Sequence, residues 1–210
     1  MQVEVNKARN SAKWQLLLMV AMVAGVIIAG FIVFPKNAEQ RDALLMRIGT
    51  TNHGELLQNP AAITELDLVD DQGMTWQPYE QQEQKAKWRL LLLGDEHCLD
   101  DCAEMLFVTR QVHLRLGKYA QRFQRVFLST AKQLDDSLRK QFHDEHPYLK
   151  VVFVDRSALN AWLENVGIAD PHGVALLVDP RGLAMMRYGV EQGGGEMLED
   201  INHLMKYSAE

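Results

Sequence analysis

The stretch WRLLLLGDEHCLDDC, residues 88–102, combines an apolar run with the only two cysteines of the chain. Its first part, Trp88 to Leu93, is nearly continuous in apolar residues, which is typical of a strand covered on both faces of a sheet. Its last part, from Cys98 to Cys102, precedes a segment with apolar residues at three- and four-residue steps, which indicates a helix. A pair of thiols where a strand leads into a helix is a candidate site of chemistry.

The composition indicates a folded protein that does not bind nucleic acid. The 210 residues are 47% hydrophobic and 24% charged, which suits one domain plus an attachment. The net charge of −6 leaves no basic stripe to offset the repulsion of a polyanion. Two cysteines are too few for a disulfide scaffold or an all-cysteine zinc site, so the pair predicts a single disulfide, a redox couple or a metal clip.

An uncharged segment near the N-terminus, from Trp14 to Phe34, is long enough to cross a bilayer as a helix. The alternative is a cleavable signal peptide, which should end in a small-x-small site after a shorter apolar core. The sequence at residues 34–37, FPKN, offers no such site, so we predict a retained anchor. A slight excess of positive charge before the helix favours a cytoplasmic N-terminus, and the cysteine pair fits an oxidising compartment for the rest of the chain.

The predicted domain organisation follows from this anchor. We expect a cytoplasmic tail over residues 1–13, a transmembrane helix over 14–34, a polar tether over 35–63 and a folded domain over 64–210.

The folded domain alternates strand and helix patterns. The predicted elements are a hairpin over residues 66–76, strands over 88–93, 123–129, 148–155 and 174–178, a last strand over 183–188 after an Asp-Pro-Arg-Gly turn, and helices over 103–118, 131–142, 157–166 (capped by Ser157 and ended by Gly167) and 196–207. The run Gly193-Gly194-Gly195 is interpreted as a hinge. Alternating strands and helices predict an α/β fold, a central mixed sheet with helices on both faces. Their order is that of a thioredoxin-like domain.

The two cysteines are spaced at i and i+4. A helix that began near Cys98 would place both sulfurs on one face, with the α-carbons near the upper part of the disulfide range. Backbone N–H groups at that helix start would favour a thiolate, with Cys98 as the nucleophile. The surrounding carboxylates (Asp95, Glu96, Asp100, Asp101 and Glu104) oppose it, because a nearby negative charge raises the pKa of a thiol. We therefore favour metal handling over a fast reductase.

Two thiolates with one imidazole suit copper(I) in a trigonal site. The predicted metal ligands are Cys98, Cys102 and His172, which precedes the strand over residues 174–178. His97 is a competitor because it adjoins Cys98, although neighbouring side chains at a strand end usually point in opposite directions. His53 is interpreted as a solvated loop residue, and Met185 and Met186 as core residues of a hairpin.

These features together resemble the Sco (SenC) family. The resemblance is carried by the membrane anchor, the thioredoxin-like order, the Cys98-x3-Cys102 pair and a histidine before the Asp179-Pro180-Arg181-Gly182 turn. It implies a role in assembling the copper centre of cytochrome c oxidase, with copper held by the two cysteines and the distant histidine, and a capacity for thiol–disulfide chemistry.

A closer resemblance is to small membrane-anchored thioredoxin-like proteins found alongside cytochrome oxidase assembly factors in gram-negative bacteria. It is carried by residues 49–57 (GTTNHGELL) and 200–204 (DINHL). It implies a single-pass protein of the inner membrane with its domain in the periplasm, and an oxidase subunit or another assembly factor as partner.

Three functions therefore stay open on the sequence. The first is an accessory factor for cytochrome c oxidase assembly that handles copper, thiol redox state or both through Cys98 and Cys102. It would act as a metallochaperone or redox factor more than as a turnover enzyme. The second is a general thiol–disulfide oxidoreductase. The third is a binding scaffold in which the cysteines form a static structural disulfide.

Overall fold

The computed structural model describes residues 2–34, 52–78, 87–95 and 97–208. The chain divides into two units, Met1–Thr51 and Asn52–Glu210, which are described separately. The part of the predicted tether over residues 35–51 lies outside the described residues.

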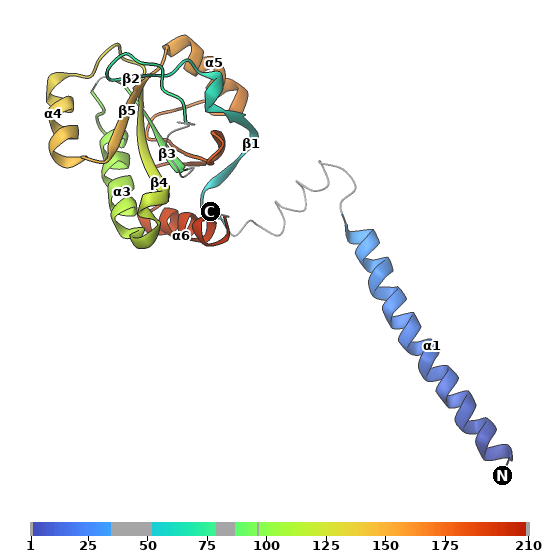
Figure 1. Cartoon of the computed structure of the whole chain (residues 1–210). Coiled ribbons are helices and arrows are strands. Elements are labelled where there is room, and N and C mark those ends of the chain that lie inside the picture. The colour runs from blue at the N-terminus through green and yellow to red at the C-terminus, as the bar shows by residue number, and fades with distance from the viewer. Residues whose placement is uncertain (1, 35–51, 79–86, 96, 209–210) are drawn as a thin grey trace. The chain divides into compact units, whose positions relative to one another are not determined.

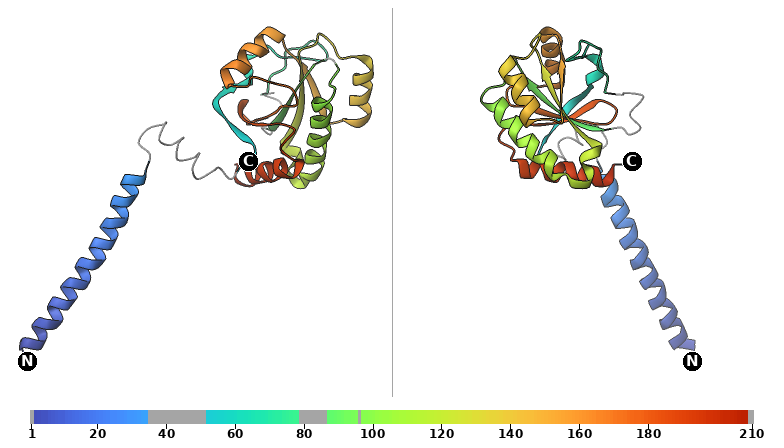
Figure 2. Two further views of the ribbon diagram at one scale, coloured as in Figure 1. Left: turned by 180° about the vertical axis from the view of Figure 1, so that it is seen from behind. Right: turned by 60° about the vertical axis from the view of Figure 1, so that its left-hand side comes forward.

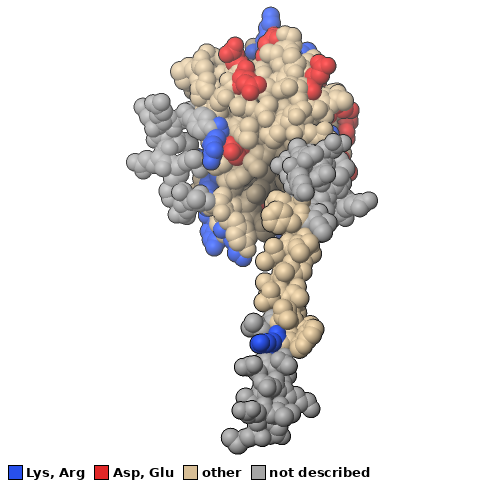
Figure 3. All heavy atoms as spheres, turned by 90° about the vertical axis from the view of Figure 1, so that its right-hand side faces the viewer, with Lys and Arg blue, Asp and Glu red and all other residues tan. Residues whose placement is uncertain are grey.

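The described part of the first unit is formed by one long helix, α1 (Gln2–Val33). Its stretch Lys13–Phe31 is long and apolar enough to cross a membrane, as the sequence predicted. The described large apolar side chains of this stretch are exposed, and Figure 3 shows that the part of the helix surface that is not grey carries little charge. A helix that buries none of its apolar surface within the protein is a membrane anchor or a signal sequence and not a core helix.

The second unit is built on one seven-stranded sheet with the order β1-β7-β6-β3-β4-β5-β2. Strand β3 pairs parallel with β4, and β4 with β5, while every other neighbouring pair is antiparallel. The strands are β1 (Glu55–Ala62), β2 (Val69–Asp70), β3 (Trp88–Gly94), β4 (Phe123–Ser129), β5 (Leu149–Phe153), β6 (Ala175–Val178) and β7 (Leu183–Tyr188). The mixed sheet confirms the predicted class.

Helices cover both faces of this sheet (Figures 1 and 2). They are α3 (Asp101–Arg115), α4 (Asp136–Glu145), α5 (Arg156–Val166) and α6 (Gly194–Tyr207), with short 3-10 turns η1 (Ile63–Glu65) and η2 (Gly117–Arg122). In the central strand, Leu90 and Leu92 pack with α3, α4 and α6, whereas Leu91 and Leu93 pack with α5. The alternation of side chains along a strand thus divides one apolar run between two cores.

Strand β1 is the main departure from the predicted elements. Residues 55–62 were assigned to the tether, but they form the edge strand that pairs with β7. The pairing is irregular between Leu56 and Ala61, and Pro60 lies in this interval. Proline and a bulge are tolerated at a sheet edge because one side of the strand needs no partner.

The starts of α5 and α6 also differ from those predicted from the sequence. Asp155, and not Ser157, caps α5, because its carboxylate accepts hydrogen bonds from the backbone N–H groups of Ser157 and Ala158. Gly167 ends α5 in the left-handed conformation, as predicted. The predicted glycine hinge is instead the start of α6. A β-carbon on Gly194 would lie 3.2 Å from Val108, so a glycine there lets α6 approach α3 closely.

Candidate functional site

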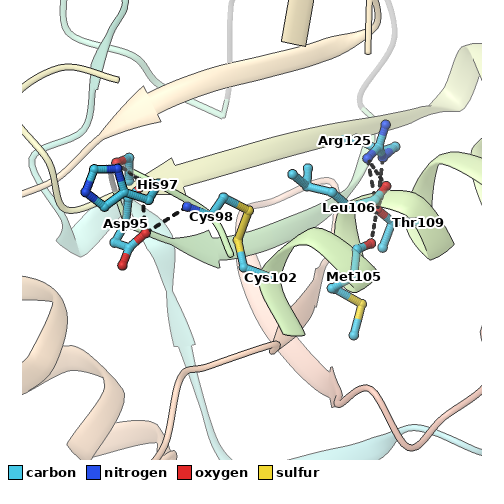
Figure 4. The surroundings of a disulfide bond; sticks show 9 residues. Asp95, His97, Cys98, Cys102, Met105, Leu106, Thr109 and Arg125 are labelled. Atoms are coloured by element: carbon cyan, nitrogen blue, oxygen red, sulfur yellow. Dashed lines mark hydrogen bonds between the residues drawn. A yellow bond between two sulfur atoms is a disulfide. The ribbon is translucent and has the colours of Figure 1, made fainter. Parts of the chain in front are cut away.

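The loop from β3 to α3 carries a disulfide between Cys98 and Cys102 (Figure 4). Helix α3 begins at Asp101, so Cys98 lies in the loop and the prediction that both cysteines share one helical face is wrong. The two α-carbons are 5.0 Å apart, closer than a helical i, i+4 pair would bring them. Positive φ angles at Cys98 (+46°) and Asp100 (+49°) fold the loop back on itself and produce this approach.

A turn centred on Asp95 fixes the backbone of Cys98. The Asp95 carboxylate accepts hydrogen bonds from the N–H groups of His97 (3.0 Å) and Cys98 (2.9 Å). The Cys98 hydrogen bond is the main reason why the pKa of Asp95 lies below its usual value. The Ser129 hydroxyl donates in turn to the Asp95 carbonyl (3.2 Å), which ties this turn to the end of β4. The loop is therefore ordered by polar contacts as well as by the disulfide.

The two cysteines differ in their surroundings. Cys98 is only 4% exposed and belongs to the core beneath α3, together with Met105. Cys102 is half-buried and faces a groove. A β-carbon on Gly94 would lie 3.1 Å from the Cys102 sulfur and 2.3 Å from the Phe127 ring, so Gly94 leaves the space that this cysteine occupies.

The groove beside Cys102 has a volume of about 430 Å³. It is bounded by the β3–α3 loop, the start of α5 and the loop before β6, and its lining residues include His97, Leu99, Asp101, Cys102, Arg156 and His172. A β-carbon on Gly173, whose φ is +63°, would lie 2.7 Å from the β-carbon of Asp101. Glycine at this position lets the loop with His172 press against the start of α3.

The predicted site residues are thus only partly brought together. Cys102, His172 and the competitor His97 line one groove, whereas Cys98 lies behind Cys102. The acidic surroundings are present in Asp95, Asp100, Asp101 and Glu104, which are exposed, and Glu96 lies outside the described residues. Arg156, from the start of α5, adds a positive charge that was not anticipated, because it is far away in the sequence.

Met186 is 2% exposed and packs in the core, as predicted, and Met185 packs partly buried against the same core. His53 is an exposed loop residue, as predicted, and its ring nitrogen lies 3.2 Å from the exposed carboxylate of Glu199.

The donor set of Cys98, Cys102 and His172 suits copper(I) by chemistry, since it offers two sulfurs and one imidazole. In the disulfide form the sulfurs are bonded to each other and are not thiolate ligands. Within the described part of the chain, no three His, Cys, Asp or Glu side chains are grouped so that they could hold a metal ion. Copper ligation by these residues therefore requires prior reduction of the disulfide, and it stays a prediction.

A sheet of this topology with a cysteine pair between a strand and the helix after it defines a thioredoxin-like protein. Within that class, the chain belongs to the family described as "Transmembrane-like, thioredoxin-like, C-terminal domain", whose model matches residues 88–208. No curated protein matches the chain.

Solved structures share this fold at low sequence identity. Yeast Sco1 with copper bound is 18% identical, with a TM-score of 0.54, and the match covers 77% of this chain and 97% of that one. Arabidopsis thaliana ScoI with copper bound is 14% identical (TM-score 0.52; 71% and 98% covered). A thiol:disulfide interchange protein from Bacteroides sp. is 16% identical (TM-score 0.50; 75% and 92% covered). At these identities the similarity establishes the thioredoxin-like fold and nothing finer.

Proposed function

We propose that this protein exchanges its Cys98–Cys102 disulfide with the thiols of a client during assembly of cytochrome c oxidase. The observation that carries the proposal is the position of the disulfide, in a strained loop at the edge of an open groove. A disulfide that serves only stability needs neither a groove nor residues in unfavourable backbone conformations.

The chemistry of exchange follows from this geometry. A client thiolate attacks one sulfur of the pair, a mixed disulfide forms, and the other sulfur leaves as a thiolate. A second client thiol then displaces the bound sulfur, so the client gains a disulfide and the pair becomes a dithiol. Two electrons pass from the client to the pair, and the reverse sequence reduces a client disulfide.

The cellular setting that we propose rests on α1 and on the resemblance to oxidase assembly proteins. Helix α1 would anchor the protein in the inner membrane as a single-pass segment, with residues 1–13 in the cytoplasm and the domain in the periplasm. The client would be an oxidase subunit or another assembly factor. The Cys98–Cys102 disulfide supports this placement, because cysteine pairs form disulfides in oxidising compartments such as the periplasm.

A redox titration of the detergent-solubilised full chain tests the exchange function. We expect a reduction potential between about −120 and −270 mV, the range of exchange-active pairs, whereas structural disulfides lie below about −300 mV. The measurement is the fraction of oxidised Cys98–Cys102 in dithiothreitol buffers, read by thiol alkylation. A potential below about −300 mV would support the static scaffold instead.

Copper handling is the second candidate, because His172 and Cys102 line the same groove. The reduced full chain should then bind one copper(I) in competition with a chelator, and both Cys98→Ser and His172→Ala should weaken binding at least tenfold. His143→Ala is the matched control, because His143 is an exposed helix residue on α4. Stoichiometric binding that is indifferent to His172→Ala would remove His172 from the ligand set.

A further inference from the structure

We infer that Cys102, and not Cys98, is the sulfur that forms the mixed disulfide with a client. This inference rests on the exchange function proposed above and reverses the order expected from the sequence, in which Cys98 is the nucleophile. It starts from the different surroundings of the two sulfurs.

Access to the two sulfurs is unequal. Thiol–disulfide exchange requires the incoming sulfur to approach one sulfur of the pair directly. Cys102 is half-buried against the same core but lines the groove, which gives a client thiolate a path towards it. Cys98 is 4% exposed and packs in the apolar core, and its backbone is held by the Asp95 carboxylate. An attack on Cys98 would require the loop to open first.

The electrostatics of the reduced pair favour the same residue. Cys102 is the second residue of α3, where backbone N–H groups have no partner within the helix and stabilise a thiolate. The groove that Cys102 faces is lined by Arg156 and also by Asp95, Asp100 and Asp101, whose negative charges oppose the effect of the arginine. Burial of Cys98 among apolar side chains disfavours its charged form. The helix start and the burial of Cys98 therefore favour Cys102 as the thiolate, in agreement with its access to the groove.

One effect acts in the opposite direction. An attack on Cys102 expels Cys98 as the leaving thiolate, and a buried thiolate leaves more slowly than an exposed one. Access decides the outcome, because a sulfur that the client cannot reach cannot be attacked, however good its partner is as a leaving group. In the reverse direction, reduced Cys102 attacks a client disulfide and Cys98 is the resolving thiol: it attacks the Cys102 sulfur of the mixed disulfide, re-forms the Cys98–Cys102 disulfide and releases the client as a dithiol.

The groove also indicates the kind of client segment. Its walls combine an exposed leucine, Leu99, with His172 and the arginine of α5. Asp95, Asp100 and Asp101 line the same groove, so an extended cysteine-containing segment with an apolar neighbour and no net negative charge would fit it.

Two single-cysteine variants of the full chain test the inference. Cys98→Ser retains Cys102, and Cys102→Ser retains Cys98, so each variant is the matched control of the other. With 5,5′-dithiobis(2-nitrobenzoic acid) at neutral pH, we expect Cys102 to react at least tenfold faster than Cys98. In urea the two rates should become similar. A Cys98 rate equal to or above the Cys102 rate in the folded variants would overturn the inference.

A second measurement avoids dependence on the fold of the variants. The reduced wild-type chain is treated with a substoichiometric amount of iodoacetamide, and the modified cysteine is identified by mass spectrometry. Alkylation first at Cys102 supports the inference, and alkylation first at Cys98 refutes it. Neither experiment uses a client, so a failure here is distinct from a failure of the proposed exchange function, which the redox titration tests.

Discussion

Replacement of Asp100 by glycine should stabilise the disulfide form of the protein. Asp100 lies inside the loop closed by the disulfide and has φ +49° and ψ −120°, a conformation that glycine adopts far more readily than other residues. Its side chain makes no capping hydrogen bond to α3. The substitution therefore removes strain without removing a cap.

The size of the effect can be worked from these angles. An L-residue in the left-handed region costs about 1–2 kcal/mol. The substitution removes this cost. Glycine in turn loses about 0.5–1 kcal/mol more on folding than another residue, because it has more conformational freedom in the unfolded chain. The expected net gain is therefore about 0.5–1 kcal/mol for the oxidised protein. Reduction opens the loop and lets Asp100 relax, so the reduced protein should gain less.

The difference between the two gains appears as a change in reduction potential. A substitution that stabilises the disulfide form more than the dithiol form makes the disulfide harder to reduce. For a two-electron couple, a difference of up to about 1 kcal/mol between the two gains corresponds to a shift of up to about 20 mV towards more negative potential. The assays are urea unfolding of the oxidised and reduced full chain, and the redox titration described above.

Asp136→Gly is the control for this substitution. Asp136 is the exposed first residue of α4 and has no positive φ, so glycine there should only destabilise the protein. Equal effects of Asp100→Gly on the oxidised and reduced forms, or destabilisation as large as that of the control, would show that the loop holds no strain.

Three further substitutions probe the fold. Burial lowers the pKa of His146 to about 4. The free energy of unfolding should therefore fall by about 2–3 kcal/mol as the pH drops from about 6.5 towards 4, because the unfolded chain binds the proton more readily. In urea unfolding, His146→Gln should flatten this pH dependence. Asp200→Ala should lower the free energy of unfolding in urea by about 3 kcal/mol, because it leaves the Tyr188 hydroxyl and two backbone N–H groups without their acceptor. The control Asp136→Ala, at an exposed position, should cost far less. Gly94→Ala should cost about 1–3 kcal/mol by overpacking against Phe127, measured as a lowered midpoint.

The parts of the fold that the sequence predicted well are those with a strong local pattern. The bounds of β4 and β7 agree with the predicted strands, because each has a clear β-prone run between turn residues. Strand β1 was missed because the segment from Leu56 to Pro60 has few apolar residues and its partner lies more than a hundred residues further along the chain. Edge pairing of this kind leaves almost no signal in the sequence.

The functional site was likewise predicted only in the parts that have a local signal in the sequence. The cysteine pair and the histidine of the facing loop could be selected by residue type and spacing. The start of α3 after Cys98, the burial of that cysteine and the approach of Arg156 could not, because each depends on tertiary contacts. The aspartate-rich loop has residues typical of a helix start, and its positive φ angles at Cys98 and Asp100 have no signal in the residue types.

The carboxylate of Asp200 has a mechanical consequence. It accepts hydrogen bonds from the backbone N–H groups of His53 and Gly54, at the point where the chain enters the domain, and it is 5% exposed within α6. A force applied to the preceding chain would therefore act first on the hydrogen bonds between Asp200 and residues 53–54, and then on β1 at the sheet edge. Strands β7 and β6 separate β1 from β3, which leads into the disulfide loop. Tension from the N-terminal side would thus be dissipated before it could distort the reactive sulfurs.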